Sequence, residues 1–105
     1  MAAIEVLGRP WNALILNVLL RGPLRFSELS AAAKGPGDKV LSARLKELEG
    51  CGLLVRQVDP GPPVRVSYAL TEQGRGFNEV ATAIERWGRS LGPVRKEWPS
   101  RRTKG

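Results

Sequence analysis

The chain has 105 residues, 42% of them hydrophobic, and a formal net charge of +7 from 17 Lys and Arg against 10 Asp and Glu. That length and apolar content fit one domain with a single core, and the charge favours nucleic acid as a partner over an anionic membrane surface. Histidine is absent and Cys51 is the only cysteine, which excludes the common zinc sites, an intrachain disulfide and a histidine-dependent catalytic triad, so we expect no enzyme activity, cofactor or metal.

The N-terminal residues lack the basic and apolar segments of a secretory signal. The most apolar window, residues 11–20, is about half as long as the ~20 residues that cross a bilayer. Together with the single cysteine, these features predict a cytoplasmic protein that does not enter the membrane.

The first predicted helix begins at Pro10, which suits a first helical turn because its missing N–H costs nothing there. The helix continues through the apolar window and ends before Gly22-Pro23. A short helix is expected next over residues 25–33, with Phe26 and Leu29 as inward anchors. Arg25 and Ser27 lie at its start, where they could hold a DNA phosphate. The alternative is that Ser27 only caps the helix and Arg25 is solvated.

A third helix is predicted from Gly37 or Asp38 to about Glu49. Its apolar stripe has helical spacing and consists of Leu41, Leu45 and Leu48. The opposite arc carries two cations, one hydroxyl and one methyl group: Lys39, Ser42, Ala43 and Lys46. Such groups can bond to base edges or phosphates and allow close approach to the groove floor. Arg44 lies at the boundary, where it could reach a phosphate or pack its stem against a neighbour.

The spacing of apolar residues then changes. Strands are expected over residues 53–58 and 64–70, joined by the turn Asp59-Pro60-Gly61-Pro62-Pro63. The prolines disfavour a tight two-residue hairpin and predict a protruding loop. We expect this loop to present Arg65 to DNA.

A final helix is expected from Thr71, as its cap, to about Leu91. Its apolar residues alternate in steps of three and four: Phe77, Val80, Ile84, Trp87 and Leu91. This a/d-type seam has too little partner surface within one chain, so we expect two copies to bury it together as a homodimer. Residues 92–105 carry five cations and one carboxylate. They are predicted to form a flexible basic tail that neutralises phosphates, following a domain over residues 1–91.

The order of elements predicts a mainly α fold with a small β wing, a winged helix-turn-helix that is homodimeric through its terminal helices. In such a fold a short helix braces a second one, which enters the major groove, while a hairpin reaches the flanking backbone or minor groove. The arc of the third helix would then contact DNA. The alternative is an ordinary solvated helix face.

These residues resemble the HxlR-type bacterial transcription regulators within the MarR-like winged-helix group. The resemblance covers about residues 8–87 and rests on five segments: Gly-Arg-Pro-Trp at 8–11 and the stretches 22–29, 39–49, 52–56 and 63–71. It implies a homodimeric DNA-binding repressor or activator in which the third helix reads DNA, the hairpin through Arg65 is the wing, and the C-terminal helix belongs to the dimer interface.

The chain departs from the family at two points. Family members often have a cysteine before the first core helix, used by some for thiol sensing, whereas residues 4–7 contain none. We therefore expect a regulator that does not respond to oxidants through Cys51. Gly37-Asp38 stands where relatives often have a serine cap, so the Asp38 carboxylate is expected to cap the helix or accept a hydrogen bond from a cytosine amino group.

Three functions remain open at this point. The predicted one is sequence-specific binding of a pseudo-palindromic operator on double-stranded DNA by a dimeric regulator. The alternatives are a nucleoid-type protein with little sequence preference and a winged-helix module that binds another protein. The sequence leaves open whether a small-molecule effector binds as well.

Overall fold

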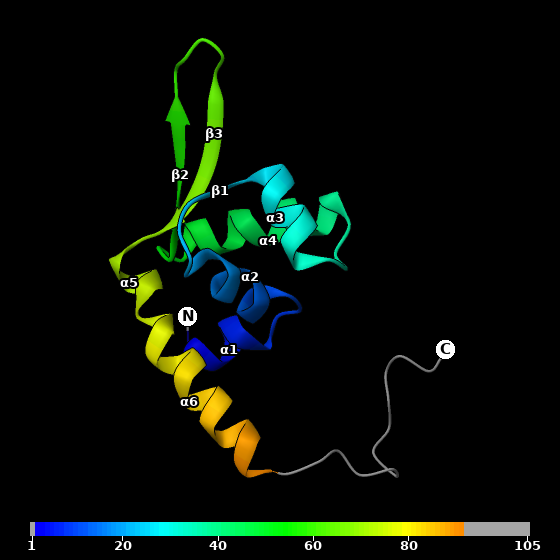
Figure 1. Ribbon diagram of the computed structural model, residues 1–105, viewed down its shortest axis with the longest axis vertical. Coiled ribbons are helices and arrows are strands. Elements are labelled where there is room, and N and C mark those ends of the chain that lie inside the picture. The colour runs from blue at the N-terminus through cyan, green and yellow to red at the C-terminus, as the bar shows by residue number, and fades with distance from the viewer. Residues whose placement is uncertain (1, 92–105) are drawn as a thin grey trace.

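A β-hairpin projects from one end of a helical body, and a long helix leaves the body at the other end (Figure 1). The computed structural model describes residues 2–91. Its elements are, in chain order, α1 (Ala3–Gly8), α2 (Asn12–Leu19), β1 (Leu24–Arg25), α3 (Phe26–Ala33), α4 (Asp38–Gly50), β2 (Leu54–Asp59), β3 (Arg65–Leu70), α5 (Glu72–Arg75) and α6 (Phe77–Ser90). The predicted fold class, mainly α with a β wing, is confirmed.

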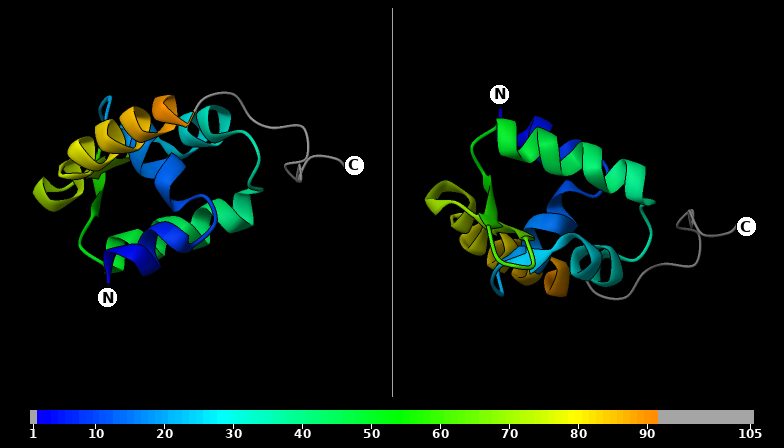
Figure 2. Two further views of the ribbon diagram at one scale, coloured as in Figure 1. Left: turned by 90° about the horizontal axis from the view of Figure 1, so that it is seen from below. Right: turned by 90° about the horizontal axis from the view of Figure 1, so that it is seen from above.

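Helix α2 lies between α4 and α6 (Figure 2). The core extends to α1, β2, β3 and the first turn of α6, but it is centred on α2, α3 and α4. These three helices supply its largest fully buried apolar side chains: Ile15, Leu16, Leu19, Leu29, Leu41, Leu45 and Leu48. Burying each such side chain stabilises the fold by about 1.5–3 kcal/mol. The predicted apolar stripe of the third helix is therefore confirmed, and it fixes which face of α4 points outward.

The N-terminal part differs from the prediction of one helix beginning at Pro10. The structure has two helices, α1 and α2, joined at Trp11, whose φ of 75° lies in the left-handed region. Fully buried Asn12 donates a hydrogen bond from Nδ2 to the carbonyl oxygen of Val6 at 2.9 Å. This bond and the burial of Val6 hold α1 against α2, a tertiary effect that helical spacing does not reveal.

The three strands form an antiparallel sheet in the order β1-β3-β2. The hairpin register pairs Leu54 with Leu70 and Asp59 with Arg65. Strand β1 was not predicted, because two residues are too few to show a period. At the hairpin tip, Gly61 has a φ of 69° and its N–H donates to the Asp59 carboxylate at 3.2 Å, so the loop protrudes as expected.

The predicted C-terminal helix is two helices, α5 and α6, that meet at Gly76. Thr71 caps α5 as predicted: its Oγ1 accepts from the Gly74 N–H at 3.1 Å and donates to the Gly52 carbonyl at 2.6 Å. A Cβ at Gly74 would lie 2.1 Å from the Leu53 carbonyl oxygen, so the close packing of α5 on the sheet requires glycine here. Within residues 2–91, no helix is long and apolar enough to cross a membrane. The predicted tail, residues 92–105, lies outside the described residues.

Candidate nucleic-acid interface

Helices α3 and α4 and the turn over residues 34–37 form a helix-turn-helix. Glu28 closes the start of α3 by accepting the Arg25 N–H at 2.8 Å, and the Ser30 hydroxyl donates to the Asp38 carboxylate at 3.2 Å. Asp38 thus connects the two helices. This engagement differs from both roles expected for it, helix capping and acceptance from cytosine.

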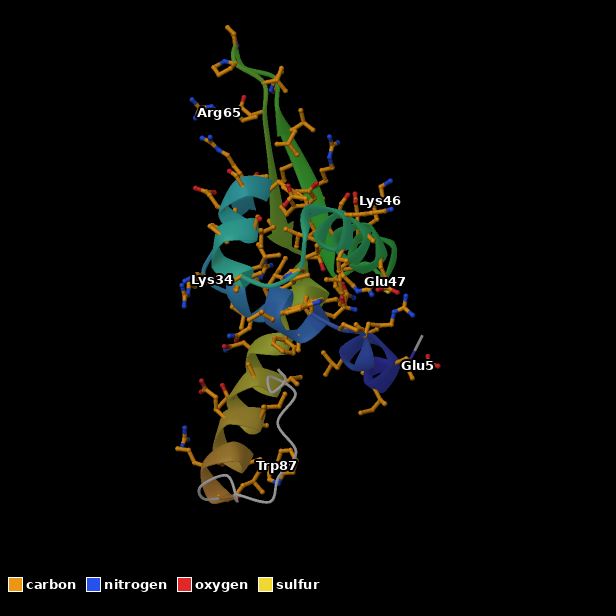
Figure 3. The ribbon with its side chains drawn as sticks, turned by 90° about the vertical axis from the view of Figure 1, so that its right-hand side faces the viewer. Glu5, Lys34, Lys46, Glu47, Arg65 and Trp87 are labelled. Atoms are coloured by element: carbon orange, nitrogen blue, oxygen red, sulfur yellow. The ribbon has the colours of Figure 1, made fainter. Side chains whose placement is uncertain are left out.

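The outward face of α4 carries the predicted arc. All four of its residues are exposed: Lys39, Ser42, Ala43 and Lys46. The charged end of Lys46 projects away from the body (Figure 3). Because the opposite face of α4 is buried in the core, the helix presents this arc to any partner that approaches the helix-turn-helix.

The wing and the start of α3 are joined through the sheet. Arg25 pairs with Ser67 of β3 and also precedes α3 as its N-terminal cap residue. The side chain of Arg65, the first residue of β3, is exposed, as is that of Arg25. Figure 3 shows Arg65 on the wing, above the helical body. The predicted cations outside α4 are therefore accessible, on elements that share backbone hydrogen bonds with one another.

Arg44 lies differently from the rest of the predicted DNA-contacting set. Its Nε donates to the Pro10 carbonyl at 3.0 Å, its Nη1 lies 3.8 Å from Glu47 Oε1, and its side chain is only 19% exposed. Of the two uses expected for Arg44, the structure therefore has the contact with neighbouring residues.

Two polar residues that sequence reasoning did not single out for the site meet next to Arg44. Arg9 Nη2 lies 3.0 Å from Glu47 Oε2, and Asn12 Nδ2 lies 3.5 Å from Glu47 Oε1. The one local signal was the i,i+3 spacing of Arg44 and Glu47. Arg9 and Asn12 are far from Glu47 in sequence, so only the fold brings them to it.

The seam expected on the C-terminal helix divides into a buried and an exposed part. Phe77 is 8% exposed and belongs to the core, so the first turn of α6 packs on its own chain and leaves little of the Phe77 side chain open to a second copy. The other four residues are 39–65% exposed: Val80, Ile84, Trp87 and Leu91. Helix α6 extends away from the body (Figure 1), which leaves this apolar face uncovered by described parts of the chain.

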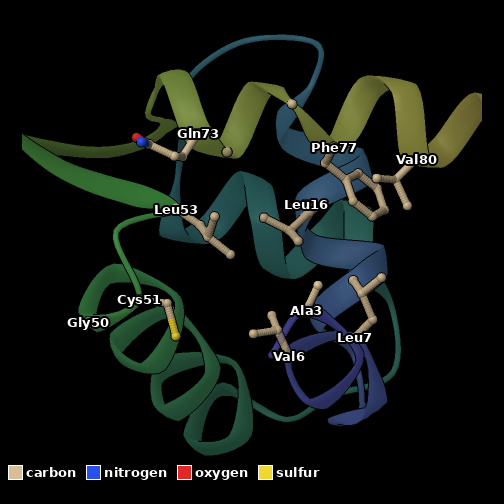
Figure 4. A pocket seen from close by; sticks show the side chains of 12 residues that line it. Ala3, Val6, Leu7, Leu16, Gly50, Cys51, Leu53, Gln73, Phe77 and Val80 are labelled. Carbon is tan, nitrogen blue, oxygen red and sulfur yellow. The ribbon is translucent and has the colours of Figure 1, made fainter. Parts of the chain in front are cut away.

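An apolar cavity of about 580 Å³ lies between α1, the end of α4 and the α5–α6 region (Figure 4). Val6 and Leu7 line it from α1, Phe77 and Val80 from α6, and Cys51 from the end of α4. No charged residue is among its described lining residues. Its chemistry suits an uncharged apolar molecule.

Comparison with known proteins places the whole arrangement in a family. The sequence profile described as HxlR-like helix-turn-helix matches residues 6–96. The HTH-type transcriptional regulator YodB of Bacillus subtilis is 42% identical over 86 residues, covering 82% of this chain and 77% of YodB. The uncharacterized HTH-type transcriptional regulator YvaP of the same organism is 44% identical over 85 residues, covering 81% of this chain and 79% of YvaP.

Solved structures agree. Reduced YodB from B. subtilis superposes with a TM-score of 0.81 at 40% identity, covering 86% of this chain and 88% of YodB. A transcriptional regulator described as MarR-family, from Enterococcus faecalis V583, superposes with a TM-score of 0.78 at 30% identity, covering 85% of this chain and 81% of that protein. YodB has also been solved in a quinone-bound form, with a TM-score of 0.75 at 38% identity, covering 84% of this chain and 91% of that one.

Proposed function

Because the chain belongs to the HxlR-like helix-turn-helix family, we propose that it reads a pseudo-palindromic operator on double-stranded DNA as a homodimer. The chain is a helix-turn-helix transcription regulator and not an enzyme. The proposal adds the dimer and the DNA-contacting residues: Arg25, Ser27, Lys39, Ser42, Ala43, Lys46 and Arg65.

The observation that supports this surface is the two-sided character of α4. Leu41, Leu45 and Leu48 are 0–1% exposed, whereas the arc of small and cationic residues opposite them is open. The buried leucines hold α4 in place, and its opposite face carries small and cationic side chains. Such a face fits a major groove, because small side chains allow close approach and cations can bind guanine edges or phosphates. The exposed Arg65 on the wing fits the flanking backbone.

The proposal is tested by selecting bound duplexes from a random pool, then measuring operator and random-duplex affinity at several salt concentrations. We expect an inverted repeat with half-sites ~34–36 Å apart, or a multiple of that distance. Preference over random DNA should be about 10³-fold or more. A nucleoid-type protein would give salt-dependent binding with no consensus, and a protein-interaction module would give no salt-dependent DNA binding.

Substituting the arc should change which bases are preferred. Lys39→Ala and Ser42→Ala are each expected to reduce base preference at defined operator positions. Where the substitution removes a bidentate hydrogen-bond pair with a base, operator binding should weaken by about 1–3 kcal/mol. Competition with operators mutated one base pair at a time measures this effect. Arg21→Ala removes an exposed cation outside the arc and should leave the preferred bases unchanged. If Lys39→Ala and Ser42→Ala also leave them unchanged, α4 is not the reading helix.

We also propose that an effector binds in the cavity between α1, α4 and α6, and that this effector is an uncharged apolar small molecule. The volume of about 580 Å³ falls in the range of roughly 300–1,000 Å³ that is typical of small-molecule sites. The quinone-bound form of YodB supports small-molecule binding in a relative. Since Gly50 and Cys51 at the end of α4 line the cavity, a bound molecule would contact the C-terminal end of the proposed reading helix.

Titration with the neutral fluorophore N-phenyl-1-naphthylamine tests this site. The emission should rise on saturable binding, and Ala3→Trp should abolish the rise because an indole at this lining position fills the cavity. Ala2→Trp, one residue earlier and outside the lining, is the matched control and should still bind the probe. Equal binding by both variants would contradict the assignment.

A further inference from the structure

The segment that joins α1 to α2, residues 8–12, runs along the helix-turn-helix and contacts it repeatedly. We call it the N-terminal strap. The Arg9 guanidinium lies 3.0 Å from the Glu47 carboxylate of α4, and the Pro10 carbonyl accepts the Arg44 Nε–H at 3.0 Å. Asn12 Nδ2 bonds to the Val6 carbonyl at 2.9 Å and lies 3.5 Å from Glu47 Oε1. Both α1 and α4 are therefore connected to the same few residues.

Glu47 is the point at which these contacts meet. Its carboxylate faces three donors, Arg9, Asn12 and Arg44, from two different parts of the chain. The Glu47 and Arg44 side chains are only 22% and 19% exposed. The Arg9 side chain is 53% exposed, so the shielding from water comes from the Glu47 and Arg44 side of the cluster, where water competes less with the contacts than it does in a fully exposed pair.

The strap also touches the helix-turn-helix at a second place, through Trp11. A Cβ added at Gly35 would lie 2.5 Å from the Trp11 ring, so the indole sits directly on the turn that leads into α4. Gly35 has a φ of 143°, a conformation that favours glycine. The strap thus contacts the turn before α4 at Gly35 and the helix itself further along, at Glu47. We expect these two separated contacts to limit the movement of α4 relative to the strap.

We propose that Glu47 is a positioning residue for DNA recognition: it ties the N-terminal strap to α4 through Arg9 and Asn12, and it lies beside Arg44, which bonds to the Pro10 carbonyl of the strap. The inference rests on the proposed function. Hydrogen bonds to base edges are broken by a small displacement of the helix, since they need donor and acceptor at about 3 Å in good alignment. Contacts between long flexible lysines and phosphates tolerate the same displacement. Removing the Glu47 carboxylate should therefore weaken specific binding selectively.

The experiment compares the full-length wild type with Glu47→Ala, using the duplex recovered from the random pool and a random duplex at several salt concentrations. For Glu47→Ala we expect operator affinity to fall on the order of tenfold, random-duplex affinity to stay within about twofold, and the salt slope to stay unchanged. Glu49→Ala removes an exposed carboxylate from the same helix and should match the wild type. Thermal unfolding sets a temperature at which all variants are folded.

A substitution of Arg44 distinguishes a role in positioning α4 from a direct contact with a DNA phosphate. If Arg44 neutralised a phosphate, Arg44→Gln would flatten the slope of log K against log salt by about 0.9, as we expect for Lys46→Gln. A positioning role predicts a weaker operator preference with an unchanged slope. In addition, Arg9→Ala should cost little further specificity once Glu47→Ala is present, because both variants remove the same ion pair.

Three results would overturn the inference alone: unchanged preference in Glu47→Ala, equal weakening on operator and random DNA, or a flattened salt slope in Arg44→Gln. A wild type that binds both duplexes equally would overturn the proposed function as well, so the two failures are distinguishable.

Discussion

A chain carrying Trp87→Glu is expected to sediment as a monomer at micromolar concentration, where the wild type sediments as a dimer, and to bind the operator about 10²- to 10⁴-fold more weakly. The first effect follows from α6, whose exposed apolar stripe includes Ile84 and Trp87, 47% and 65% exposed. Two-fold symmetry brings the same patch of both copies together, so the substitution buries two carboxylates near each other. The second effect follows because a monomer engages one half-site without the high effective concentration of a linked second head.

The control for Trp87→Glu lies on the same helix. Thr82 is exposed on the side of α6 away from the stripe, and its hydroxyl donates to the Asn78 carbonyl at 2.9 Å. Thr82→Glu adds the same charge and should remain dimeric. Sedimentation velocity and operator titration measure both variants. A dimeric Trp87→Glu, or a wild type that is monomeric at micromolar concentration, would remove α6 as the dimer element.

The sequence predicted α4 and the wing well because their signals are local and long. Helix α4 repeats a leucine stripe along its length, and the hairpin strands are bounded by glycine and proline. The exposure of Lys39 and Lys46 followed from the same periodicity. Helix α1 and strand β1 were missed, since six residues and two residues are too short for a period to stand out.

The remaining differences have tertiary causes. Phe77 continues the spacing of the exposed seam, yet it is buried because the first turn of α6 lies on the core. Arg44 has the sequence position of a groove-facing cation, but a carbonyl 34 residues earlier binds its guanidinium. The Gly-Arg-Pro-Trp segment contributed to the family resemblance, but nothing in the sequence indicates which residues of the chain it contacts. Only the fold brings Arg9 to Glu47 and Trp11 to Gly35.

Leu45→Ala is expected to lower the free energy of unfolding by about 2–5 kcal/mol. Leu45 is 1% exposed in the core cluster, so truncation removes its transfer free energy and leaves a cavity that the surrounding side chains fill only in part. A domain of this size has a total stability of about 5–15 kcal/mol, and each kcal/mol lowers Tm by roughly 4–8 °C. Urea denaturation at one fixed protein concentration measures the change, since dimerisation itself makes stability depend on concentration.

Val40→Ala provides the comparison for Leu45→Ala within α4. Val40 is 37% exposed, and alanine has the higher helix propensity, so we expect a change below about 1 kcal/mol. Equal destabilisation in the two variants would mean that the buried and exposed faces of α4 are misassigned. Because Leu45 lies opposite the proposed reading arc, Leu45→Ala protein that remains folded below its Tm should still prefer the same operator. The apparent affinity should then fall only in proportion to the folded fraction, which separates core packing from base recognition on a single helix.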